Sequence, residues 1–198
     1  MSTLILASAS GIRARLLREA GVQFGVRPAD VDEDEAKRSF HSQPGAKQDL
    51  SDILAALKAV SVSKACPHAL VLGCDQILSC EDRLFDKAHD IAEARKTLTA
   101  LRGKAHTLIS SSVLARDGKV VWQHQERAIL WMRAFSDEFL ESYLKTEGRS
   151  ILGSVGCFQY EGRGAQLFEC VKGDYFAILG LPLIPILAAL REQGVLPK

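Results

Sequence analysis

The sequence alternates between short apolar runs and segments whose apolar positions recur every three to four residues. The runs are typical of buried strands, and the recurring positions predict amphipathic helices. Strands are predicted at residues 3–7, 24–31, 69–74, 77–79, 83–85, 105–115, 119–132 and 165–171, and helices at 10–21, 47–65, 90–103, from 136 onward, and at 180–194. Because strands and helices are interspersed and two of the strands form a long hairpin, we expect an α/β fold with a mixed sheet flanked by helices.

Local signals mark several ends of these elements. Ser10 and Ser136 precede predicted helices as N-caps, and Asp90 with Glu93 forms a capping box. The pair at 117–118, Asp-Gly, predicts a tight hairpin turn. Residues 36–46 are polar and contain proline and glycine, and 153–164 are rich in glycine, so both segments are predicted to be loops. We expect residues 1–198 to form a single domain.

The composition is that of an ordinary globular protein. Apolar residues make up 47% and charged residues 25% of the 198 residues, and the formal net charge is +1, so no broad basic field for nucleic acid exists. The five cysteines are odd in number and lack a C-x-x-C pair, which favours free thiols in a reducing compartment. No signal peptide is recognisable, and the apolar stretch 177–190 is interrupted by prolines and too short to span a membrane. We therefore expect a soluble, cytoplasmic protein.

The junction between the first strand and the first helix is a candidate phosphate site. A helix N-terminus presents unpaired N–H groups and a partial positive charge, to which Ser8, Ser10 and Arg13 add donors and a cation. No acidic residue lies in the first turn of this helix. The segment lacks the Walker pattern, so an ordinary capped helix remains the alternative.

Two acidic positions are candidates for chemistry. Glu33 lies in a run of five acids at 30–35, which could be a solvated loop or a source of oxygen ligands for Mg²⁺. Asp75 follows the apolar run 69–74, and carboxylates at the carboxyl ends of buried strands commonly belong to sites in α/β sheets. A turn aspartate is the alternative for Asp75.

The candidate cations are two lysines. Lys64 continues the seven-residue steps from Leu50 and Leu57, which predicts that it faces inward, toward either a structural carboxylate or a substrate phosphate. Lys87 follows the small predicted hairpin and would by itself be an ordinary surface lysine. The five histidines show no zinc-ligand spacing, and no G-x-S-x-G nucleophile motif occurs.

These segments together resemble the signatures of the Maf family, in order and over nearly the whole chain. The resemblance is carried by residues 4–10 with Arg13, and by the segments 30–33, 63–65, 73–76, 85–87, 162–165 and 180–183. The segment 85–87 matches the family's Gly-Lys-Pro only in its lysine. The resemblance implies a fold like that of inosine-triphosphate pyrophosphatases, with an elongated mixed sheet and two lobes around a cleft.

The resemblance also implies an activity. Maf proteins are metal-dependent pyrophosphatases that convert a nucleoside triphosphate into a monophosphate and pyrophosphate. Asp75 would then be the catalytic acid/base residue, Glu33 and Asp75 would hold Mg²⁺ or Mn²⁺, and the phosphates would bind Ser8, Ser10, Arg13, Lys64 and Lys87. A homodimer is expected by resemblance, with the long hairpin that carries Trp122 and Trp131 as a candidate surface.

Three positions distinguish the substrate types of this family. Gln76 and Glu161 match the 7-methyl-GTP type, whereas Ile12 matches neither that type nor the thymidine/uridine-triphosphate type. Gly11 and Ala88 replace prolines of the family pattern, which should loosen two loops without removing a charged group.

Two other functions compete with the enzymatic one. The protein could be a nucleotide-binding regulator of cell division without turnover, or a metal-free structural partner protein. The enzymatic hypothesis requires Glu33 and Asp75 to lie close together, beside a helix N-terminus and lysine ammonium groups that point inward.

Overall fold

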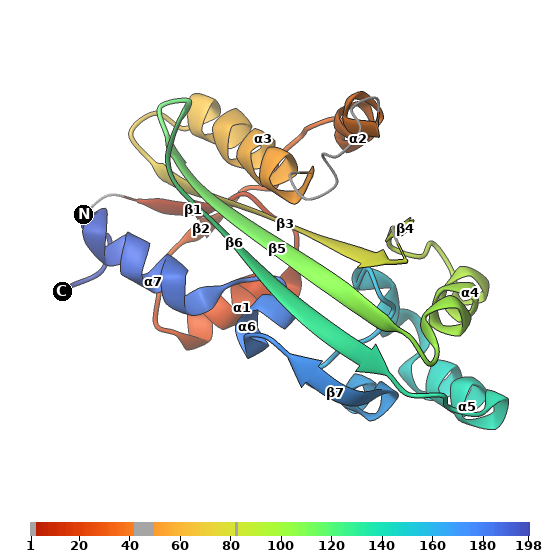
Figure 1. The fold of residues 1–198 in the computed structure, drawn as a ribbon. Helices are drawn as coiled ribbons and strands as arrows, with labels where there is room; N and C mark the ends of the chain where they lie inside the picture. The colour runs from red at the N-terminus through yellow and green to blue at the C-terminus, as the bar shows by residue number, and fades with distance from the viewer. Residues whose placement is uncertain (1–2, 42–49, 82) are drawn as a thin grey trace. The chain divides into compact units, whose positions relative to one another are not determined.

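The computed structural model describes residues 3–41, 50–81 and 83–198 (Figure 1). The strands are β1 (Leu4–Leu6), β2 (Gly25–Val26), β3 (Leu70–Cys80), β4 (Arg83–Phe85), β5 (Ala105–Arg116), β6 (Lys119–Met132) and β7 (Phe168–Lys172). The helices are α1 (Gly11–Glu19), α2 (Glu33–His41), α3 (Leu50–Ala65), α4 (Ile91–Leu101), α5 (Asp137–Glu147), α6 (Tyr175–Ile178) and α7 (Leu183–Glu192). Two 3₁₀ helices, η2 (Gly148–Gly153) and η3 (Arg163–Leu167), occupy much of the segment before β7.

The strands form one mixed sheet in the order β2-β1-β3-β5-β6-β7, with β4 paired to β3. β1 runs parallel to both β2 and β3, whereas β4 runs antiparallel to β3 and β7 antiparallel to β6. The predicted α/β class with a mixed sheet is thus confirmed. No helix among the described residues is both long enough and apolar enough to cross a bilayer.

The chain divides into two compact units. The first contains Met1–Gln76, Ser110–Glu126 and Gly180–Lys198, and the second contains Ile77–Ile109 and Arg127–Leu179. The second unit has a large apolar core that includes Leu98, Leu130 and Tyr143. Its helices α4 and α5 and the 3₁₀ helix η2 contact one another.

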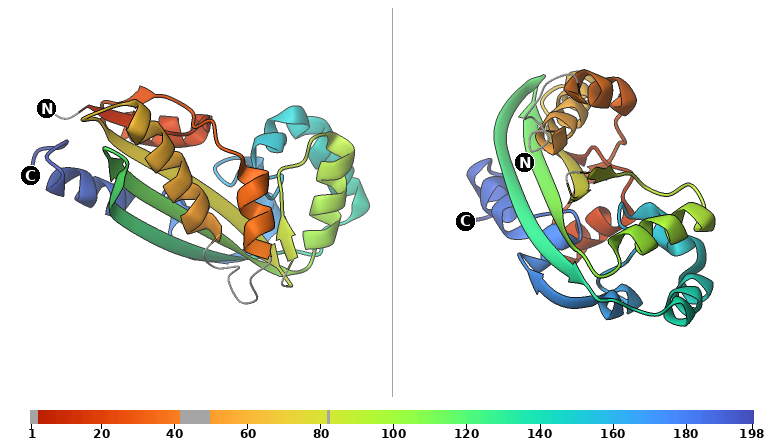
Figure 2. Two further views of the ribbon diagram at one scale, coloured as in Figure 1. Left: turned by 90° about the horizontal axis from the view of Figure 1, so that it is seen from above. Right: turned by 45° about the vertical axis from the view of Figure 1, so that its right-hand side comes forward.

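In the first unit, α3 packs directly on β3 and β5, alongside which it lies in Figures 1 and 2. Where the helix meets β5 its buried side chains are small: Ala55 and Ala59 pack against Val113. Gly73 of β3 permits this approach, because a Cβ there would lie 2.3 Å from the backbone oxygen of Ala55. The helix and the strand are therefore close enough for their polar side chains to meet.

Several predicted local signals are confirmed. The Asp90 carboxylate accepts the backbone N–H of Glu93 at 2.8 Å, and the Ser136 hydroxyl caps α5. Asp117 and Gly118 both have positive φ, 49° and 78°, as a tight hairpin turn requires. All five cysteines are free thiols.

Other boundaries differ from the prediction. The second strand, predicted over residues 24–31, spans only Gly25–Val26. Residues 36–41 belong to α2 and not to a loop, because the Asp32 carboxylate accepts the Glu35 N–H at 2.8 Å and acids in the first turn suit the helix dipole. The rest of the predicted loop, 42–46, and the predicted start of α3 at residue 47 lie outside the described residues.

Candidate functional site

Asp75 lies within β3 and not at its end, which corrects the prediction from the sequence. The strand continues for five residues beyond Asp75, to Cys80, because residues 77–80 are mostly buried and residues 78–80 pair with β4. Side chains alternate between the faces of a strand, so Asp75 shares the face of Gly73, against which α3 packs. Asp75 is therefore buried, with 7% of its surface exposed.

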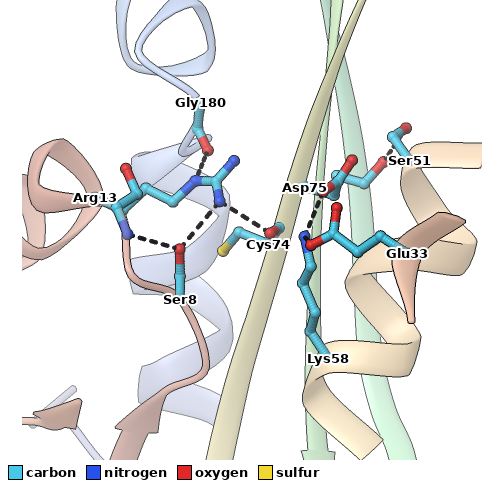
Figure 3. A network of polar contacts seen from close by, with 10 residues as sticks. Ser8, Arg13, Glu33, Ser51, Lys58, Cys74, Asp75 and Gly180 are labelled. Carbon is cyan, nitrogen blue, oxygen red and sulfur yellow. Dashed lines mark hydrogen bonds and ion pairs between the residues drawn. The ribbon is translucent and has the colours of Figure 1, made fainter. Parts of the chain in front are cut away.

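Lys58 of α3 joins the two predicted acidic residues. Its ammonium nitrogen lies 2.6 Å from Oδ1 of Asp75 and 2.9 Å from Oε1 of Glu33, the first residue of α2 (Figure 3). α2 contacts α3, which brings Glu33 to the same side of the sheet as Asp75. Glu33 and Asp75 thus converge on a single cation, as the enzymatic hypothesis required.

Lys58 was missed in the sequence, and the inward orientation predicted for Lys64 is wrong. Lys64 is exposed, and Leu57 on the same seven-residue series is 41% exposed. The buried residues of α3 include not only the large Leu50, Leu54 and Val62 but also the small Ser51, Ala55 and Ala59, which a count of large apolar positions overlooks. The signal that could have found Lys58 is its place seven residues after the buried Ser51, on the face of small residues.

Ser51 is buried because it has a partner across the interface between helix and sheet. Its hydroxyl lies 2.7 Å from that of Ser111 on β5, and both residues are fully buried. This hydrogen bond satisfies both hydroxyls where water cannot reach them. It also fixes the rotation of α3 about its axis, and with it the direction in which Lys58 points.

The predicted phosphate cradle is assembled around Arg13, on the other side of β3 from Lys58 (Figure 3). The guanidinium donates to Oγ of Ser8 at 3.2 Å, to the carbonyl of Cys74 at 2.9 Å and to the carbonyl of Gly180 at 2.8 Å. All three acceptors are neutral oxygens. The guanidinium is therefore oriented by hydrogen bonds to neutral groups, and its charge also acts on the nearby Asp75 carboxylate.

The end of β1 explains why the carbonyl of Cys74 is available. The carbonyl of Leu72 still pairs with the N–H of Ala7, but β1 ends there. Two residues further along β3, the carbonyl of Cys74 points toward the same edge and accepts from Arg13 instead of from a strand. The carbonyl that orients Arg13 and the acidic residue Asp75 thus belong to neighbouring positions of β3.

Ser10 precedes α1 with an extended backbone, as predicted for an N-cap, yet its side chain makes no capping hydrogen bond. Its backbone N–H donates to Oγ of Ser8 at 3.2 Å. The first turn of α1 contains no acidic residue. The start of this helix therefore keeps the electrostatic character expected of an anion site.

Burial dominates the electrostatics of the acidic residue. It raises the pKa of Asp75, and the Glu33 carboxylate adds to the rise, whereas Lys58 and Arg13 oppose it. Burial also raises the pKa of the neighbouring Cys74 thiol, which keeps it protonated and neutral. Burial therefore favours the protonated form of Asp75, while the Lys58 and Arg13 cations favour its ionised form.

The remaining predicted residues lie in different surroundings. Gln76 donates to the Ser110 hydroxyl at 2.8 Å, and Ile12 is half-buried in the first turn of α1. Lys87 and Glu161 belong to the second unit, where both are exposed. The roles assigned to these residues in substrate binding stay predictions.

The donor set can be tested against the metal that the family resemblance implies. The Lys58 ammonium acts as a stand-in cation, since one carboxylate oxygen from Glu33 and one from Asp75 already contact it. Within the described parts of the chain, no cluster of three or more metal-binding side chains occurs. Two carboxylates suit Mg²⁺, which usually keeps several waters and takes further ligands from substrate phosphates. The residues therefore fit a metal that binds together with a nucleotide.

Comparison with known proteins gives consistent results. The sequence pattern of the family described as Maf-like protein matches residues 3–193. A nucleoside triphosphate pyrophosphatase of Granulibacter bethesdensis is 47% identical over 98% of both chains, and a 7-methyl-GTP pyrophosphatase of Brucella abortus is 45% identical over 96% of both. A solved HAM1 protein from Coxiella burnetii covers 68% of this chain and 75% of its own, with 13% identity and a TM-score of 0.41, which is too low to support an inference.

Proposed function

The chain belongs to the Maf-like protein family, and from this premise we propose that it hydrolyses a nucleoside triphosphate to a nucleoside monophosphate and pyrophosphate. The observation that carries the proposal is the convergence of Glu33 and Asp75 on one cation position, next to the Arg13 cradle along β3. The activities named for its relatives of about half-identical sequence support the same reaction.

The cradle is suited to the phosphates. The Arg13 guanidinium is held by three hydrogen bonds to neutral acceptors, so it can also bind a phosphate oxygen. Cleavage between the α- and β-phosphates builds negative charge on the departing pyrophosphate. A guanidinium that is already oriented stabilises this charge without reorganising during the reaction. We assign Ser8 and the N-terminus of α1 to the same phosphate group.

The acidic pair is suited to the metal and the water. We propose Glu33 and Asp75 as ligands of Mg²⁺ or Mn²⁺, which when bound neutralises phosphate charge and acidifies water. Asp75 can also accept a proton from the attacking water, and its raised pKa makes it a better base than an ordinary aspartate. Both roles require the ionised carboxylate, so activity should fall as pH drops through the pKa of Asp75.

The test is pyrophosphate release from a nucleotide panel that includes 7-methyl-GTP, UTP, CTP and dTTP, with Mg²⁺ or Mn²⁺. Asp75→Asn should abolish release, because the amide neither accepts the proton nor binds the metal as a carboxylate does. Asp34→Asn, at an exposed neighbour of Glu33, is the matched control and should stay active. A folded, metal-loaded protein that is inert toward the whole panel would refute the proposal. Calorimetric binding without product would favour the non-catalytic regulator.

Substrate preference and assembly extend the proposal. Gln76 and Glu161 support a 7-methyl-GTP-like substrate, as does the name of the Brucella abortus relative. A preference for dTTP or UTP in the panel would contradict this assignment. The homodimer and the cytoplasmic location stay predictions, and a light-scattering mass near that of one 21.6 kDa chain would contradict the dimer.

A further inference from the structure

Lys58 occupies the position between the two carboxylates that the proposed function assigns to a metal. Its ammonium contacts one oxygen of each, at 2.6 Å and 2.9 Å, and only 12% of its side chain is exposed. Asp75 is equally enclosed, with 10% of its side chain exposed, whereas Glu33 is 43% exposed. A metal ion and the ammonium cannot occupy this space together.

The charges favour the ammonium while the site is empty of nucleotide. Two neighbouring carboxylates repel each other, and burying one of them without a cation is unfavourable. Lys58 supplies that cation from the same protein, so it has no translational entropy to lose. A metal ion must displace it, and the displaced ammonium then needs another anion, because its surroundings are largely shielded from water.

A nucleotide phosphate provides such an anion. We propose that Lys58 holds the metal position in the free protein and transfers to a substrate phosphate when the metal enters, so that metal binding depends on nucleotide binding. This inference rests on the proposed function for the identity of the anion. Lys58 is then a positioning residue that keeps Glu33 and Asp75 together and weakens metal binding to the nucleotide-free site by competing with the metal ion.

The first test measures Mn²⁺ binding to the nucleotide-free protein by electron paramagnetic resonance. Lys58→Met removes the competing cation and should tighten Mn²⁺ binding at least ~10-fold, the change that a difference of about 1.4 kcal/mol produces. Lys96→Met, at an exposed lysine in α4, is the control and should bind Mn²⁺ as the wild type does. Equal or weaker Mn²⁺ binding by Lys58→Met would overturn the inference.

The second test uses the wild-type protein and so does not depend on a variant that folds. Lysine acetylation read by mass spectrometry should find Lys58 protected relative to Lys96 without metal. Saturating Mn²⁺ without nucleotide should increase acetylation of Lys58 but not of Lys96, because the displaced amine becomes accessible. Unchanged protection of Lys58 with Mn²⁺ bound would contradict displacement. Neither test measures turnover, so absence of pyrophosphate release would refute the proposed function without deciding this inference.

Discussion

We expect the buried His106 to lower the stability of the folded protein in acid. It lies on β5 in the second unit, 2% exposed, with its ring 5.9 Å from that of Phe158 and 5.8 Å from that of Phe168. Within the described residues, neither ring nitrogen has a hydrogen-bond partner. Burial lowers the pKa of His106 from 6.5 to about 4, so the folded protein holds this side chain neutral while the unfolded chain protonates it.

The sign and size of the effect follow from linkage. Because the pKa of His106 is lower in the folded state, its effect on stability is absent above pH 6.5 and grows as pH falls toward 4. At about 1.4 kcal/mol per pKa unit, the full loss is about 3 kcal/mol, of which about 2 kcal/mol should be present at pH 5. His106→Phe keeps an aromatic ring among aromatic neighbours and removes the titrating group.

The assay is urea unfolding of both proteins at pH 8 and pH 5. A Trp122→Phe background leaves Trp131, in the second unit, as the single fluorescent reporter of that unit. The free energy of unfolding of His106→Phe minus that of its parent should be about 2 kcal/mol larger at pH 5 than at pH 8. This difference cancels the contribution of the carboxylates, which both proteins share, to the pH dependence of unfolding. It also cancels any packing effect of the substitution that does not depend on pH. A difference that is the same at both pH values would refute the reasoning.

Three further variants test the site and the packing behind it. In steady-state kinetics, Lys58→Met should lower kcat/KM by about 10- to 100-fold, as the loss of a charged hydrogen bond does. Lys64→Met should change kcat/KM less than about threefold. A larger loss in Lys64→Met than in Lys58→Met would favour the inward orientation of Lys64 that the sequence predicted. Gly73→Ala should destabilise the first unit by more than ~3 kcal/mol in chemical denaturation, because the added Cβ would lie 2.3 Å from the Ala55 backbone oxygen. If this variant were as stable as the wild type, α3 would have to pack less closely on β3 than the structure shows. Gly180→Ala should raise KM for the nucleotide, because a φ of +85° is strained for alanine and the Gly180 carbonyl orients Arg13. An unchanged KM would show that the hydrogen bond from Arg13 to this carbonyl is dispensable.

Features set by neighbouring residues could be predicted from the sequence. The caps at Asp90 and Ser136 and the hairpin turn at Asp117 each depend on hydrogen bonds or dihedral angles within a few residues. The Ser8–Arg13 cradle was predicted for a similar reason, since a strand that turns directly into a helix brings these two residues together. The acidic pair was identified through its family motifs, and its convergence is borne out by the geometry.

The sequence by itself thus determined most of the helices and strands, the mixed α/β class and the family, because these follow from local energetics and from motifs in order along the chain. It did not determine α2 or the extents of the second strand and β3. Only the tertiary structure decided which lysine faces the acids. The rotation of α3 is set by how closely Ala55 approaches Gly73 and by the hydrogen bond between Ser51 and Ser111, and both contacts join segments far apart in sequence. The packing of the whole helix decides where each of its side chains points, and the periodicity of large apolar residues does not describe a buried face that also contains alanine and serine.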